Sequence, residues 1–179
     1  MNIHSIPFQE VRDFFMQAER LVKNFFHSPT KIDITNPIIS SYTNGIELYL
    51  DKTITTYFKQ HFIDMYGEDC KRIPENDWKN LHIGLRSVFK GKQITLGTWE
   101  DLMEKFQQTG NNALLNSFKA CLPFKDVDTV LETVRKATEF LTPIRNPSLH
   151  GKIIPWEEFS QSYPQIIRII NELIDTLTE

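Results

Sequence analysis

Several features that decide the class of a protein are scarce or missing in this chain of 179 residues. No apolar run approaches the roughly 18 residues that a membrane-spanning helix needs. The first residues, Met1-Asn2-Ile3-His4, lack the basic and apolar regions of a secretory signal. The two cysteines, Cys70 and Cys121, form no CxxC pair and no disulfide framework. We therefore expect a soluble, cytoplasmic protein with two reduced thiols and no membrane partner.

An excess of charge of one sign is also missing, because 20 Lys and Arg oppose 23 Asp and Glu, which gives a net charge of −3. A general electrostatic attraction to nucleic acid is not expected, so any polyanion site must be a local patch. The sequence has no P-loop, GxGxxG or GxSxG motif. His27, His61 and His82 lack HxH or HExxH spacing, so we interpret them as surface or core residues and predict no metal and no cofactor.

Strand-like alternation is absent, and helical periodicity fills most of the chain. Apolar residues at spacings of three and four predict a helix from Phe8 to Phe25 and a final helix from Trp156 to Leu177. Pro155 suits the first turn of the final helix, and Pro164 is expected to kink or divide it. Asn36 and Pro37 predict the N-cap and first residue of a long helix that Gly67 ends.

The middle of the chain carries weaker helix signals. They predict helices from Asn76-Asp77 to about Gly91, from Thr98 as an N-cap through Phe106, and from Leu114 to Leu122, with a turn at 110–112. Asp126 begins another clear helix. The chain lacks internal repeats and low-complexity linkers. We therefore predict one all-α domain over residues 1–179, built as an antiparallel bundle of about five to seven helices.

The segment Arg145-Asn146-Pro147-Ser148-Leu149-His150 lies between the last two helical patterns. On a continuous helix, Arg145 and His150 would point roughly 140° apart. Pro143 and Pro147 argue against continuity, and Asn146 is disfavoured in the helical region because it precedes proline. We therefore predict a broken backbone in which Asn146 caps a new turn and His150 lies within that turn.

These residue types suit cleavage of RNA through its own 2′-hydroxyl group. That reaction needs a base, an acid and a cation where charge builds on the phosphorus. Histidine exchanges protons near neutral pH, and arginine stays charged and fits phosphate oxygens with two N–H groups. One Arg–His pair is too few groups for all three roles. Two copies facing each other across a dimer would supply them.

The motif resembles the R-x(4–6)-H signature of the HEPN superfamily, whose active members are metal-independent ribonucleases with a composite site between two domains of a dimer. The resemblance covers about residues 126–178. It implies that Arg145, His150 and Asn146 are catalytic, and that the setting is a toxin–antitoxin pair with an antitoxin partner or antiviral defence. One subgroup, paired with a nucleotidyltransferase, carries a tyrosine two residues after the histidine. This chain has Lys152 there, so that partner is not expected.

Other polar residues near the motif are candidate contacts for an RNA substrate. We predict this role for Lys152, Ser148 and Lys125; Lys119 and the cluster of Arg86, Lys90 and Lys92 would extend the path, unless they are simply solvated. The alternative function is a non-catalytic all-α module that binds RNA or a protein, alone or within a larger multidomain protein. An open cleft shared by two motifs would favour the enzyme, and a buried, internally bonded His150 would favour the module.

Overall fold

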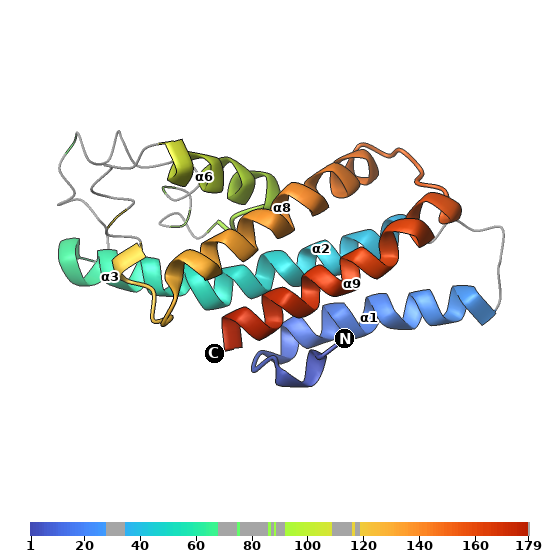
Figure 1. Ribbon diagram of the computed structural model, residues 1–179, viewed down its shortest axis with the longest axis horizontal. Helices are drawn as coiled ribbons and strands as arrows, with labels where there is room; N and C mark the ends of the chain where they lie inside the picture. The colour runs from blue at the N-terminus through green and yellow to red at the C-terminus, as the bar shows by residue number, and fades with distance from the viewer. Residues whose placement is uncertain are drawn as a thin grey trace.

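The computed structural model describes residues 1–27, 35–67, 75, 86, 88, 92–108, 116 and 119–178. These residues form helices and contain no strand, which confirms the predicted all-α class. Figure 1 shows the long helices lying side by side as a bundle, with the shorter α6 (Leu96–Gln108) against α8. The predicted helix at 77–90 and the turn at 110–112 lie almost wholly outside the described residues. Of the predicted helix at 114–122, residues 116 and 119–122 are described, and of these 116, 119 and 120 are helical.

The first two helices pack antiparallel. A short 3₁₀ helix, η1 (Ile3–Ser5), precedes α1 (Gln9–His27), which matches the predicted helix and buries Val11, Phe15, Ala18 and Val22. Gly45 of α2 (Thr35–Leu50) faces α1 closely, since an added Cβ would lie 2.9 Å from a Phe15 ring atom. The absence of a side chain at Gly45 therefore allows α1 and α2 to approach closely at this point.

The predicted long helix from residue 37 to 66 forms, but it changes its winding part-way. After α2, a π-helical segment η2 (Asp51–Thr55) leads directly into α3 (Thr56–Tyr66). Gly67 ends the continuous run of α2, η2 and α3 as predicted. Its φ is 87°, and its N–H donates to the Ile63 carbonyl. The helix begins at Thr35, one residue before the predicted cap, so Asn36 is already in its first turn.

Helix α6 begins earlier than predicted. The predicted cap Thr98 lies inside the helix, and Thr95 takes the capping role instead. The Thr98 N–H donates to the Thr95 hydroxyl at 3.4 Å, and the Trp99 N–H donates to the Thr95 carbonyl at 2.9 Å. Trp99, Leu102 and Met103 then face the core.

The last two helices carry the motif between them. Helix α8 (Val127–Leu149) begins at the predicted cap Asp126, whose side chain accepts from the Thr129 N–H at 3.0 Å. Helix α9 (Trp156–Thr178) follows the predicted bounds closely. Pro155 lies just outside it, and Pro164 lies inside it without dividing it, so of the two predicted effects only the division is wrong and the kink stays a prediction.

A ring contact and a hydrogen bond show how α1 and α9 are arranged in the bundle. α8 and α9 are antiparallel neighbours, and α9 also runs antiparallel to α1, since Phe25 stacks on Trp156 while Asn2 bonds Asn171. The buried apolar residues form one cluster shared by the described helices.

Burial raises the pKa of Cys121 to about 11, while Cys70 lies outside the described residues. No helix in the described part combines the length and apolar character that a membrane crossing requires.

Candidate functional site

The C-terminal end of α8 is closed by a Schellman motif. The Gly151 N–H donates to the Ser148 carbonyl at 3.3 Å, and the Lys152 N–H donates to the Pro147 carbonyl at 3.0 Å. This pattern needs a left-handed residue just past the helix, and Gly151 supplies it with φ at 74°. His150 is therefore the C-cap residue of α8, and its backbone position is fixed from both sides.

The predicted backbone break before Pro147 is absent. Helix α8 continues through Pro143 and Pro147 to Leu149, so Asn146 does not cap a new turn and His150 does not lie within one. Because Pro147 lacks an N–H, the ladder loses one bond there, but the His150 N–H still reaches the Asn146 carbonyl at 3.3 Å. Sequence reasoning overrated the prolines, since the Schellman closure and the packing of α8 hold the helical path.

His150 and Asn146 are exposed at this helix end. In the described part of the chain, no hydrogen bond or ion pair involves the His150 imidazole. The Ser148 hydroxyl, predicted to contact substrate, instead donates to the Arg145 carbonyl at 2.8 Å. The His150 imidazole is therefore accessible to a bound molecule.

Arg145 has the opposite environment. Its Nη2 lies 2.8 Å from Oε1 of Glu47 on α2, and only 13% of the arginine side chain and 8% of the glutamate side chain are exposed. The same Glu47 oxygen accepts the backbone N–H of Leu96, the first residue of α6, at 2.7 Å. Three helices therefore meet at one carboxylate, and Arg145 is held by it.

The two partners of this ion pair are not fully satisfied. Burial raises the pKa of Glu47, and the Leu96 N–H and the charge of Arg145 offset only part of that rise. The Nε of Arg145 is buried and has no hydrogen-bond partner among the described residues. Since guanidinium carries five N–H donors, the ion pair leaves donors of Arg145 for another acceptor.

A second contact ties the motif to α2. The Asn36 side-chain amide donates to the Lys152 carbonyl at 3.1 Å, so the residue predicted as a helix cap instead fastens the α8–α9 connection. Arg145, Asn146, Ser148, His150 and exposed Lys152 therefore share one end of the bundle. Ile153 beside them is 64% exposed.

Lys125 does not belong to this site. It precedes α8, and a helix of 23 residues is about 34 Å long. Lys119 lies at the same distant end and pairs with Asp128 at 2.8 Å. Of the basic cluster, Lys90 lies outside the described residues and Lys92 is exposed before α6. Lys125 and Lys119 therefore cannot contact a phosphate next to His150 of the same subunit.

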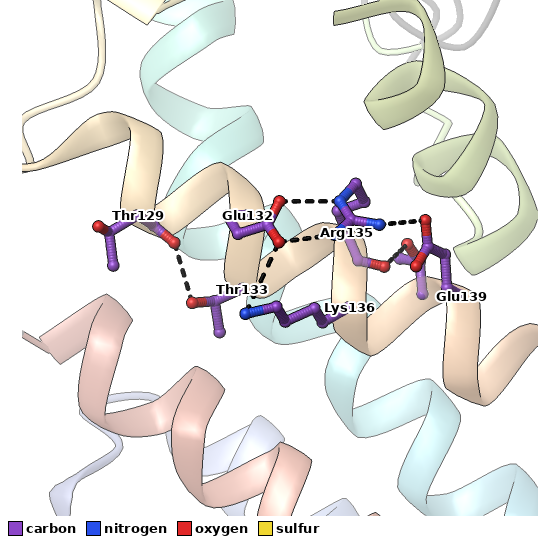
Figure 2. A network of polar contacts seen from close by, with 7 residues as sticks. Thr129, Glu132, Thr133, Arg135, Lys136 and Glu139 are labelled. Carbon is purple, nitrogen blue, oxygen red and sulfur yellow. Dashed lines mark hydrogen bonds and ion pairs between the residues drawn. The ribbon is translucent and has the colours of Figure 1, made fainter. Parts of the chain in front are cut away.

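The N-terminal half of α8 carries a different polar group. Figure 2 shows Arg135 between Glu132 and Glu139, with Lys136 reaching back to Glu132, all on one helix. These side chains are far more exposed than the Arg145–Glu47 pair. The network strengthens α8 without reaching another helix.

Glu47 and Asn36 are the site residues that the sequence did not reveal. Glu47 lies among apolar residues on the buried face of α2, and a carboxylate in that position signals a buried cation partner. The signal does not say which cation.

No group of three or more metal-ligating side chains occurs in the described part of the chain. Neither models of known protein families, nor curated proteins, nor solved structures match this chain.

Proposed function

We propose that this protein is a metal-independent endoribonuclease of the HEPN type, acting as a two-fold dimer. The observation that carries the proposal is the pairing of an exposed, unbonded His150 with an arginine held in place five residues earlier. The two residues are about 7.5 Å apart along the axis of the continuous helix α8 and point about 140° apart around it, so the proposal requires a second protomer to bring an Arg145 and a His150 together. The site would need no cofactor.

Each group has a role in the proposed reaction. His150 transfers the proton of the attacking 2′-hydroxyl or of the leaving 5′-oxygen. Arg145 offers the donors that Glu47 leaves unused to the charge that develops on the phosphorus. Asn146 and Lys152 are exposed beside them and can bind flanking phosphates or bases. The toxin or antiviral setting comes from the resemblance of the motif alone.

The dimer follows from the shortage of groups in one motif. A two-fold axis places the same patch opposite itself, so two copies of the α8 end would supply acid, base and cation together. Exposed Ile153 next to Lys152 provides apolar area for such a contact. Light scattering at micromolar concentration should report twice the mass of 21.0 kDa.

The decisive experiment incubates end-labelled RNA with the pure protein in EDTA. We expect cleavage that leaves a 2′,3′-cyclic phosphate and a 5′-hydroxyl, and no cleavage of DNA or of 2′-O-methylated RNA, because both lack the nucleophile. His150→Ala should lower the rate by about 10²–10⁴-fold. His4→Ala, which removes an exposed histidine in η1, should leave it unchanged. Intact RNA with the wild-type protein, or equal rates for both variants, would refute the enzyme.

A second function is favoured by the burial of Arg145. An arginine committed to Glu47 can serve only to join α2 and α8, in which case the exposed end of α8 is a non-catalytic surface for RNA or a protein. Filter binding separates the two functions. RNA retained by the wild-type protein but never cut, with retention lowered by Lys152→Ala, supports the module.

A further inference from the structure

A polar hollow of about 450 Å³ opens beside the π-helical segment, away from His150. Its walls are formed by Asp51 and Thr55 of η2, Lys59 of α3, and Val88, Lys92 and Gln93 on the other side. This volume lies within the range of roughly 300–1,000 Å³ typical of small-molecule sites.

The π-helical segment is itself unexplained by its local sequence. Asp51-Lys52-Thr53-Ile54-Thr55 contains neither proline nor glycine, the usual causes of an irregular helix. Two of its five residues line the hollow. Since π-helical turns are found frequently at functional sites, the widened turn is consistent with a role in shaping this wall.

The lining carries charges of both signs. Asp51 is half-buried, and burial raises its pKa, while the Thr55 hydroxyl and the Lys52 and Lys59 charges offset part of the rise. Lys59 and Lys92 are exposed, and neither is in an ion pair within the part of the chain that the structure describes. Thr55 is 3% exposed.

Lys52 is excluded from the hollow although it follows Asp51 directly. Its Nζ lies 3.2 Å from Glu10 of α1 and 5.6 Å from the centre of the Phe8 ring. Among the residues that the structure describes, the free charges lining the hollow are therefore one carboxylate and two ammonium groups.

We propose that this hollow binds a free acidic α-amino acid, with its ammonium group on Asp51 and its two carboxylates on Lys59 and Lys92. Each charged group of this ligand pairs with a lining residue of opposite charge. A simple dianion would leave the Asp51 carboxylate without a cation, and a diamine would be repelled by Lys59 and Lys92. The Gln93 amide is a further hydrogen-bonding group for the carboxylates.

Calorimetric titration of the full chain tests this site independently of RNA cleavage. L-glutamate or L-aspartate should give saturable one-to-one binding. Glutarate, which lacks the ammonium group, and 4-aminobutyrate, which lacks the α-carboxylate, should bind at least about tenfold more weakly, since each loses a charge-assisted contact.

Variants locate the binding. Asp51→Asn and Lys59→Gln should each weaken it by about tenfold or more, while Lys52→Gln removes a neighbouring charge outside the hollow and should change it less than twofold. Circular dichroism checks that each variant keeps its helices. Absence of saturable binding by both amino acids, equal binding of glutarate, or unchanged affinity in both hollow variants overturns the site. Binding without RNA cleavage leaves the site standing and removes only the ribonuclease.

Discussion

Arg135 and Arg145 lie on the same helix, yet they are held in different ways. Arg135 bonds Glu132 and Glu139, three residues before it and four after it, in partial contact with water. Arg145 bonds one carboxylate on another helix, with both side chains nearly buried. One arginine strengthens its own helix, and the other joins two helices beside an exposed histidine.

The difference concerns energy as well as geometry. Arg135 is 23% exposed and its two glutamates are 43% and 47% exposed, and pairs open to water at helical spacing contribute about 0.3–0.5 kcal/mol each. A buried pair gains little over apolar residues but costs about 3–5 kcal/mol when one partner is removed. The buried Arg145–Glu47 pair therefore need not make the fold more stable than an apolar pair would, but loss of either charge alone should destabilise it.

The largest effect should come from removing each arginine in turn. Arg145→Ala leaves Glu47 buried without its cation and should lower the free energy of unfolding by about 3–5 kcal/mol. Arg135→Ala should lower it by less than about 1 kcal/mol. Urea denaturation measures both. Similar losses in the two variants would contradict the contrast between the buried and the exposed arginine.

A double variant separates the structural role of Arg145 from its chemical role. Glu47→Gln combined with Arg145→Met removes both buried charges and should recover most of the stability, to within about 1 kcal/mol of wild type. Under the proposed ribonuclease function, RNA cleavage should stay lost, because no cation would face the phosphate. Recovery of cleavage together with stability would show that Arg145 serves only the fold. Arg145→Ala alone cannot make this distinction, since it damages the fold as well.

The contrast also marks how far the sequence could predict the structure. The helix containing Val130, Val134, Ala137 and Leu141 and its cap Asp126 were predicted, because periodicity and capping act within a few residues. The Glu47–Arg145 contact joins residues far apart in the chain, and single-sequence patterns contain no pairing information at that range. Arg145 and His150 were found by motif, and Glu47 and Asn36 were not.

The predicted break at Pro147 failed for a related reason. Proline preferences describe an isolated backbone, whereas α8 is held by packing on α6 and by the closure at Gly151. Lys125 was grouped with the motif because it is near in the sequence, although the helix predicted from Asp126 already separated the two. Local sequence rules thus predicted the helices, whereas the contacts of Arg145 with Glu47 and of Asn36 with Lys152 depend on how the helices pack together.

A substitution at Gly151, which closes the Schellman motif at the end of α8, should have a smaller effect on stability. A Cβ at Gly151 or at Gly97 of α6 would meet nothing within 4 Å, but only Gly151 has a positive φ, 74°. Gly151→Ala should therefore cost about 1–2 kcal/mol through backbone strain, and Gly97→Ala should stabilise α6 by about 0.5–1 kcal/mol. Thermal denaturation measures both. A loss in Gly97→Ala equal to that in Gly151→Ala would show that φ is not the cause.

The smallest effect is the pH dependence of two carboxylates with opposite shifts. Burial raises the pKa of Glu47, whereas the hydrogen bond from Arg135 lowers the pKa of Glu132. A raised carboxyl pKa gives stability that is complete below the unfolded value of about 4.3 and is lost as the pH rises through the folded pKa. A lowered pKa gives stability that is present above that value and is lost as the pH falls.

Urea denaturation between about pH 2.5 and 7 tests these signs with two matched variants, because the Glu132 change falls below the unfolded value of about 4.3 and the Glu47 change above it. The free energy of unfolding of wild type relative to Glu47→Gln should fall as the pH rises, because folding disfavours the ionised Glu47. Relative to Glu132→Gln it should rise, because Arg135 favours the ionised Glu132. Glu132 is 43% exposed, so its slope should be the shallower of the two. Slopes of the same sign would mean that the charge of Arg145 outweighs the burial of Glu47.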